Sequence, residues 1–307
     1  VVAAYDINKS KVGKDLGEAI FSDPNNTMKF FDVNSTGVTV EPGVAKDGVG
    51  KFTKDIIEKV SDNDNFEASL KNSGAEILIN LLPVGSDDAV KYYAQAAINT
   101  KIGFINCIPV FIARDPEWYK KFKDNQVPLI GDDIKSQVGA TIVHRVLAQL
   151  FSDRGVKLKN TYQLNVGGNM DFLNMLEEDR LETKRTSKTS SVTSVANKGK
   201  GIEPDNVRIG PSDYVKWLED RKKAFIRLEG ESFGGAPLNI EVQLEVWDSP
   251  NSAGVTIDAV RYMKFFKDKN DLESLDLVSA WLMKAPAKSQ KDGDVLMKLH
   301  ELTHIDD

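Results

Sequence analysis

Several lysines and aspartates lie in segments where their side chains could transfer protons and bind a phosphate. They are Lys184, Lys188, Lys222 and Lys284, together with Asp171, Asp248 and Ser249. A phosphorylated substrate needs cations against its negative charge, and proton transfer beside a carbonyl needs an amine whose pKa is lowered by burial or by neighbouring positive charge. Lysines with one or two aspartates could do both. Because Lys and Arg make up roughly a tenth of any chain, spacing alone leaves this as a hypothesis.

The segment from Lys184 to Lys200 is the strongest charge anomaly of the chain. It contains five basic residues and no acidic one, whereas the whole sequence has a formal net charge of −6. Its many Ser and Thr residues are typical of a solvated, partly flexible surface loop. The alternative is a phosphate site, since Lys184 and Lys188 are four residues apart and would share one face of a helix. The acidic balance and the lack of interleaved aromatic residues disfavour a nucleic-acid partner.

Two other motifs have less demanding interpretations. His300-Glu301-Leu302-Thr303-His304 matches the zinc-protease pattern His-Glu-x-x-His, but only three residues follow it where a third ligand is needed. We therefore expect an amphipathic terminal helix there. His144 and Cys107 could form a nucleophilic pair, but no third orienting motif accompanies them, and we expect both to be core residues.

Composition places the chain among globular proteins. It has 307 residues, of which 41% are apolar and 28% charged, so a large core in one or two domains is possible. Cys107 is the only cysteine, which rules out an internal disulfide and fits a reducing, cytoplasmic location. The longest nearly apolar run, Ala75–Val84, is far shorter than the ~20 residues that span a bilayer.

Residues 1–135 alternate between apolar runs and helical patterns. The expected strands are Val1–Asp6, Glu76–Val84, Ile102–Val110 and Val127–Asp133. Helices are expected at Lys11–Phe21, after Ser86 as N-cap, and after an Asp115 cap with Pro116 in the first turn. This alternation predicts a parallel sheet covered on both faces. Asp6 would end the first strand; in a dinucleotide-binding fold an acidic residue at a strand end binds the ribose, although a turn cap is the commoner role.

The middle of the chain has a different pattern. Asn160–Gly168 and Lys223–Trp247 look extended, and the second segment alternates about Gly234 and Gly235. This is typical of an antiparallel hairpin, so a second sheet is expected here, and the helical pattern returns at Thr256.

Long segments along the whole chain resemble the myo-inositol-1-phosphate synthase family, above all its short bacterial, actinobacterial-like branch. They include Gly131-Asp-Asp-Ile-Lys-Ser136 within residues 131–145, Gly168-Asn-Met-Asp171 within residues 163–174, and residues 2–7, 82–86, 181–188, 209–213, 245–254 and 282–286. The resemblance implies an isomerase that opens glucose 6-phosphate, oxidises C5 with bound NAD, enolises, closes the ring by an intramolecular aldol step and returns the hydride. It also implies inositol biosynthesis, with phospholipid as one downstream use.

The resemblance carries site residues over to matching positions. It implies Lys184 at the C5 oxygen, Lys284 at the reacting carbonyls, and Asp171 and Asp248 as orienting carboxylates. It implies Lys188, Lys222 and Ser249 at the substrate phosphate. Around NAD it implies Asp6, Leu82, Pro83, Gly85, Ser86, Asn106, Asp132 and Asp133.

The implied architecture is α/β. A Rossmann-type NAD-binding domain would comprise residues 1–134 and 255–307, and an α+β catalytic and oligomerisation domain on an antiparallel sheet would comprise residues 135–254. Family members begin with a strand and a glycine-rich turn, and this sequence opens at what corresponds to their second strand. A homotetramer built on the inserted sheet is expected, and a divalent cation is left open. The alternatives are a net sugar-phosphate or inositol dehydrogenase and a non-catalytic family member.

Overall fold

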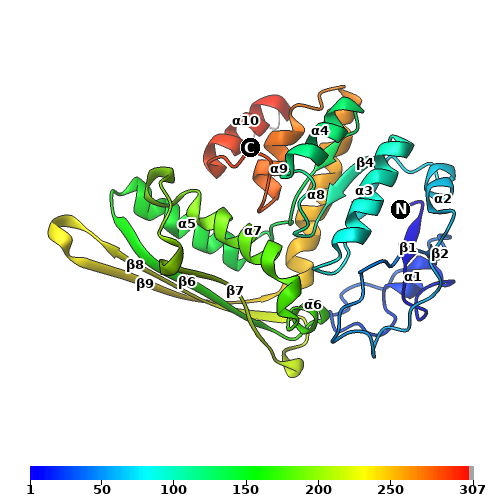
Figure 1. The fold of residues 1–307 in the computed structure, drawn as a ribbon, viewed down its shortest axis with the longest axis horizontal. Helices are drawn as coiled ribbons and strands as arrows, with labels where there is room; N and C mark the ends of the chain where they lie inside the picture. Colours follow the sequence, from blue (N-terminus) through cyan, green and yellow to red (C-terminus); the bar gives the residue numbers. More distant parts are fainter. Residues whose placement is uncertain (304–307) are drawn as a thin grey trace.

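The computed structural model describes residues 1–303, whose strands form three sheets (Figure 1). The strands are β1 (Ala4–Asp6), β2 (Val40–Pro42), β3 (Ile77–Asn80), β4 (Gly103–Asn106), β5 (Leu129–Ile130), β6 (Lys157–Gly167), β7 (Val207–Tyr214), β8 (Arg221–Glu231) and β9 (Pro237–Trp247). The α-helices are α1 (Leu16–Ala19), α2 (Phe66–Asn72), α3 (Asp87–Thr100), α4 (Pro116–Asp124), α5 (Ala140–Asp153), α6 (Met170–Asn174), α7 (Glu182–Thr193), α8 (Asp248–Asp268), α9 (Leu275–Leu282) and α10 (Asp292–Thr303).

The sheet β3–β4–β5 is parallel and is covered on both faces, as the sequence predicts. Successive residues of β4 point to opposite faces, so Phe104 packs among residues of α3 and α4 while Ile105 packs against α8 and α9. Both side chains are fully buried. The carboxyl ends of these strands therefore open at one edge of a rigid, two-sided core.

The strands β1 and β2 form a separate parallel pair. Tyr5 of β1 packs edge-on against Phe66 of α2, which in turn contacts Tyr93 of α3. The predicted helix Lys11–Phe21 is wrong in extent, because α1 covers only Leu16–Ala19. Gly13 has a φ of +87°, so the residues before α1 form turns and not helix.

The remaining sheet has the order β7-β6-β8-β9 and is mixed. Its β6–β8 and β8–β9 pairs are antiparallel, as the hairpin pattern predicts, while β7 pairs with β6 in parallel. The parallel pairing is possible because a long crossover containing α6 and α7 separates the two strands. Helices α5 and α7 cover one face of this sheet, and the other face is uncovered (Figure 1).

Helix α8 begins at Asp248, immediately after β9, and not near Thr256. The helical turn therefore already includes Asp248, which apolar periodicity could not indicate because the first turn is polar. Among residues 1–303, no helix combines the length and apolarity needed to cross a membrane.

Candidate active site

Strand register brings the lysines and aspartates together. Lys222, near the start of β8, lies opposite Gly167 at the end of β6 and opposite Val246 near the end of β9. Asp171 on α6 follows the end of β6, and Asp248 follows the end of β9. Sheet pairing thus gathers side chains that are separated by up to 77 positions in the chain.

Three of the four predicted lysines form buried or partly buried ion pairs. Lys184 Nζ lies 2.6 Å from Asp171 Oδ2, and Lys284 Nζ lies 2.8 Å from Asp133 Oδ1. Lys222 pairs with Asp248. Burial opposes the charge of Lys184, but Asp171 and Asp133 outweigh it and raise the pKa of its ammonium. Lys184 is therefore held protonated.

Lys188 is different, because no carboxylate in residues 1–303 pairs with it. It is only 7% exposed. Burial and the charges of Lys184, Lys222 and Lys284 lower the pKa of Lys188 to about 7. A buried cation among cations is costly unless an anion joins it. An anion bound there would offset this cost. The interpretation of this segment as a solvated loop is wrong, because α7 buries Lys184 and Lys188 on one face.

Asp133 and Asp132 follow β5 and have different roles. Burial would raise the pKa of Asp133, but Lys284 and Lys184 outweigh it and the pKa is lowered. Asp132 is fully buried; Asn106 Nδ2 and the backbone N–H groups of residues 112, 113 and 114 donate to it at 2.7–3.1 Å. Burial raises the pKa of Asp132 to about 7. These four donated hydrogen bonds are what favour its ionised form, and they fix the turn after β4.

The turn of residues 82–86 follows β3 and is clamped from the inserted segment. Arg180 Nε donates to Val84 O at 3.1 Å, and its Nη2 donates to Asp47 O at 2.9 Å. Gly85 has a φ of +79°, and a Cβ there would lie 2.6 Å from Arg180 Cβ, so only glycine fits. Leu82 and Gly85 are half-buried, whereas Pro83 is exposed.

Ser86 precedes α3 as predicted, but its side chain does not cap the helix. Its hydroxyl donates to Pro83 O at 2.7 Å. The carboxylate of Asp47 instead accepts from the N–H groups of Asp88 and Ala89. The cap therefore comes from a residue forty positions upstream, which local sequence could not reveal.

Two predicted ligands contact residues other than the clustered lysines. Asp6 ends β1, accepts from Asn8 N at 2.8 Å, lies 3.3 Å from Lys11 Nζ and leaves 30% of its side chain exposed. Ser249 donates its hydroxyl to Asp220 Oδ1 at 2.8 Å. Asp220 is fully buried and fixes the start of α8.

His144 and Cys107 are core residues, as predicted. His144 is fully buried between Thr161 and Gln163, and burial lowers its pKa to about 4. Burial raises the pKa of the Cys107 thiol to about 12, so it is no thiolate at neutral pH. His300 lies on α10, while His304 of the zinc pattern is outside the described residues. In the described part of the chain, no three His, Cys, Asp or Glu side chains are grouped so as to hold a metal.

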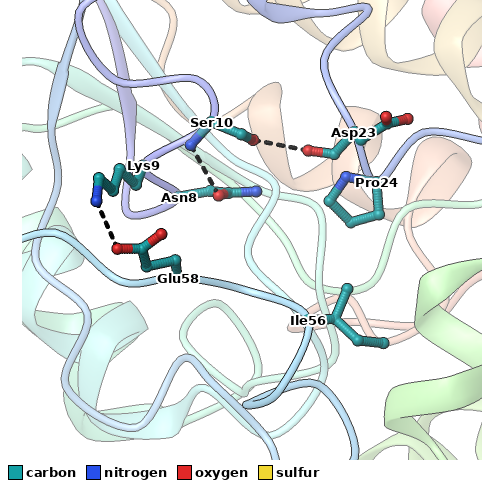
Figure 2. A pocket seen from close by; sticks show the side chains of 7 residues that line it. All are labelled: Asn8, Lys9, Ser10, Asp23, Pro24, Ile56 and Glu58. Carbon is teal, nitrogen blue, oxygen red and sulfur yellow. Dashed lines mark hydrogen bonds and ion pairs between the residues drawn. The ribbon is translucent and has the colours of Figure 1, made fainter.

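A hollow of about 420 Å³ lies elsewhere, in the N-terminal segment (Figure 2). It is lined by Asn8, Lys9, Ser10, Asp23, Pro24, Ile56 and Glu58. Lys9 is paired with Glu58 at 2.6 Å, and Ser10 Oγ donates to Asp23 O at 2.7 Å. None of the predicted site residues lines it, so the chemistry is assigned to the lysine cluster.

Comparison with known proteins shows the family. Residues 139–249, which include three of the four lysines, match the family profile of myo-inositol-1-phosphate synthase. The inositol-3-phosphate synthase of Mycolicibacterium smegmatis is 57% identical over 95% of this chain and 81% of its own. The chain belongs to the inositol-3-phosphate synthase family. The inositol-3-phosphate synthase of Corynebacterium glutamicum is 52% identical, again over 95% of this chain and 81% of its own. The family consists of isomerases that act as intramolecular lyases, and this chain is an enzyme of that class.

Solved structures confirm the α/β fold of this family member. A myo-inositol-1-phosphate synthase-related protein from Thermotoga maritima superposes with a TM-score of 0.79 at 25% identity, over 99% of this chain and 86% of the other. Inositol-3-phosphate synthase from Caenorhabditis elegans gives 0.73 at 17% identity, over 98% and 69%. The predicted combination of a Rossmann-type unit with an inserted sheet is thereby confirmed at the level of fold.

Proposed function

We propose that this chain converts glucose 6-phosphate to inositol phosphate without net oxidation or reduction, using NAD as a recycled redox group. The observation that carries the substrate class is the unpaired, buried Lys188 beside the three paired lysines. A phosphate dianion supplies the negative charge that this cluster lacks. A second cation, Lys222, lies in the same cluster and shares its charge with Asp248.

The residues present fit NAD. Asp6 stands at the carboxyl end of a parallel strand with part of its carboxylate accessible, as ribose recognition requires. The clamped turn of residues 82–86 follows the neighbouring parallel sheet. NAD would accept a hydride from C5 and return it after ring closure. The side chains of Asn106 and Asp132 hydrogen-bond to each other and to backbone groups. We therefore assign them to shaping this site and not to contacting NAD.

The lysines have distinct tasks in this proposal. Lys184, held protonated by Asp171 and Asp133, donates to the C5 oxygen and supplies the proton that this oxygen takes up when the hydride returns. Lys284, held by Asp133, stabilises negative charge on the reacting carbonyl oxygen during enolisation and ring closure. Lys188 and Lys222 anchor the phosphate, which keeps the flexible open-chain sugar in one place while its ends meet.

The test is incubation of the protein with glucose 6-phosphate and NAD. Inositol phosphate should form, measured by phosphorus NMR, with no accumulation of reduced nicotinamide in the absorbance spectrum. Steady accumulation of reduced nicotinamide would instead identify a net dehydrogenase. If the protein neither converts nor binds glucose 6-phosphate, it is a non-catalytic member of the family.

We also propose assembly into a homotetramer through the mixed sheet. Its uncovered face carries Leu164 and Phe225, which lie opposite each other on β6 and β8 and are each 37% exposed. Apolar residues on an open sheet face favour a protein partner, and a second copy is the simplest one.

A further inference from the structure

Helix α7 has a buried face that is almost free of apolar side chains. Its buried residues are Lys184, Ser187, Lys188, Ser191 and Val192. Only Val192, near the end of the helix, contributes to the apolar core of the mixed sheet. Within residues 1–303, apolar packing holds the start of α7 only through Leu181, directly before the helix, so the half that carries the lysines relies mainly on polar contacts.

Besides the pair Lys184–Asp171 and the contacts of Arg114 and Arg145 with Ser190 and Ser191, one buried contact joins Ser187 to Asp133. Ser187 Oγ donates to Asp133 Oδ2 at 2.6 Å, and both residues are at least 97% buried. The other oxygen, Oδ1, accepts from Lys284 Nζ at 2.8 Å. One carboxylate thus bridges α7 and the segment after α9.

The Lys284 side of this bridge is rigid without Ser187. Lys284 N donates to Asp133 O at 2.8 Å, and Lys284 Nζ also donates to Ile134 O at 2.6 Å. Asp133 itself has a φ of +62°, a conformation that surrounding contacts must impose on a residue other than glycine. The α7 side has no such backbone link to Asp133. Ser187 therefore makes the direct hydrogen bond between α7 and the pair Asp133–Lys284.

We propose that Ser187 is a positioning residue, which holds the Asp133 carboxylate between α7 and Lys284 so that Lys184, Lys188 and Lys284 face one substrate in a fixed register. The proposal rests on the proposed function. Ser187 lies one turn after Lys184 and directly before Lys188, so a shift of its hydroxyl moves both lysines together.

The first test compares Ser187→Ala with Ser191→Ala. Ser191 lies on the same helix and is 3% exposed, and its hydroxyl hydrogen-bonds to nothing in the part of the chain that the structure describes. We expect Ser187→Ala to lower kcat about ten- to hundredfold, the range for one hydrogen bond to a charged group, with a much smaller change in KM for glucose 6-phosphate. Ser191→Ala should resemble the wild type. Ser187→Cys, which keeps a weak donor, should fall between wild type and Ser187→Ala.

The second readout is pH dependence. The groups that face Asp133 are Lys284, Lys184 and Lys188, and Cys107, which stays neutral. Loss of the donated hydrogen bond raises the pKa of Asp133, so the acid limb of the kcat profile should move to higher pH in Ser187→Ala. The urea midpoint of Ser187→Ala should also lie below that of the wild type near neutral pH, and this difference should narrow as pH falls and Asp133 is protonated. Ser191→Ala should show neither effect.

Each outcome decides. A folded Ser187→Ala with the kcat and acid limb of the wild type would overturn the proposal. Loss of the fold in both Ser187→Ala and Ser187→Cys would also overturn it, because Ser187 would then have a purely structural role. Equal losses in Ser187→Ala and Ser191→Ala would overturn it too. If the wild type forms no inositol phosphate, the proposed function fails, while the pH-dependent difference in urea midpoint still tests Ser187.

Discussion

Lys184 and Lys188 are neighbours on one helix face, yet their surroundings push their pKa values in opposite directions. Asp171 and Asp133 raise the pKa of Lys184, whereas Lys188 is buried among like charges and its pKa is lowered to about 7. A paired lysine keeps its proton and can place it accurately, and an unpaired one recruits an anion. The two roles proposed for this residue type follow from the difference in neighbouring charges.

Removal of the Lys184 ammonium should abolish chemistry and spare the cofactor. In Lys184→Ala we expect kcat for inositol phosphate formation to fall about 10²- to 10⁴-fold, the usual contribution of a general acid or base. NAD affinity, measured by fluorescence titration, should be nearly unchanged because Asp6 and the turn of residues 82–86 are intact. Lys200→Ala, an exposed lysine beyond the same helix, is the control. Normal cyclisation by Lys184→Ala would contradict the assignment.

The buried charge of Lys188 should make the native state less stable in the absence of substrate, although the same charge would bind the substrate phosphate. The pKa of Lys188 is lowered on folding, so the unfolded chain binds the proton of this ammonium more tightly than the native state does. The resulting loss of native-state stability grows as pH falls from about 10 towards 7 and is constant below pH 7. The shift from 10.5 to about 7 corresponds to at most about 5 kcal/mol. Lys188→Met should therefore raise the urea midpoint at pH 7. The wild-type midpoint should increase as pH rises from about 7 to 10, and this increase should be smaller in Lys188→Met.

The matched control for this experiment is Lys200→Met, which should leave the midpoint unchanged. Lys188→Met should also raise KM for glucose 6-phosphate strongly. A variant less stable than the wild type at pH 7 would show that an unrecognised partner already compensates the charge of Lys188.

At this scale the sequence predicts the ionisable residues and misses those that position them. The four lysines and Asp171 and Asp248 could be named in advance because the segments that contain them resemble the family, whereas spacing alone left them a hypothesis. Ser187, Arg180 and Asp47 could not, since each acts on a segment 41 to 96 positions away and no local pattern marks it. The assignments of individual NAD and phosphate ligands stay predictions.

Among the elements, α3 shows how a helix start can depend on distant chain. Its first N–H groups are satisfied by Asp47, on the loop after β2, and Arg180 also binds the backbone of Asp47. One short loop thus joins the start of α3 to the segment that precedes α7. Its integrity matters for the turn of residues 82–86 as well as for the helix.

Replacing Asp47 should weaken this junction. Asp47→Ala should lower the free energy of unfolding by about 1 kcal/mol, the usual cost of a lost N-cap, and should weaken NAD binding because the turn before α3 loosens. Urea unfolding and fluorescence titration measure the two effects. Asp55→Ala, at an exposed position of the same N-terminal region, is the control. An unchanged NAD affinity in Asp47→Ala would contradict the second expectation, because it would show that the cap on α3 does not affect NAD binding by the turn of residues 82–86.

Element types follow from the sequence better than element ends. The alternation of strands and helices, the Asp115–Pro116 helix start and the hairpin at Gly234 are confirmed. The strands β4 and β5 are shorter than their apolar runs because these runs continue into buried turns, whereas the run of β3 continues into a partly exposed turn in which Leu81 is 69% exposed. The parallel pairing of β7 depends on a crossover whose path no local pattern encodes. The domain boundaries at 134/135 and 254/255 stay predictions.

The molecule as a whole combines a two-sided core around β3–β5 with a one-sided sheet. The uncovered face of that sheet should hold copies of the chain together (Figure 1). Phe225→Glu places a charge at this face and should lower the mass of the assembly measured by light scattering, with helical content retained by circular dichroism. Phe52→Glu changes a comparably exposed residue, 40% accessible, outside the sheet and should leave the mass unchanged. An unaltered mass in Phe225→Glu would place the interface elsewhere.

If Lys188 binds an anion as proposed, the choice of buffer affects every stability measurement on this enzyme. Any small oxyanion that occupies its site stabilises the native state by mass action, by about 2.7 kcal/mol at a concentration one hundred times its Kd. Melting temperatures recorded in phosphate or sulfate buffer would therefore describe a liganded protein, whereas those in a zwitterionic buffer would describe the free one. A thermal-shift series in the two buffers is a direct way to see which variants have lost the site.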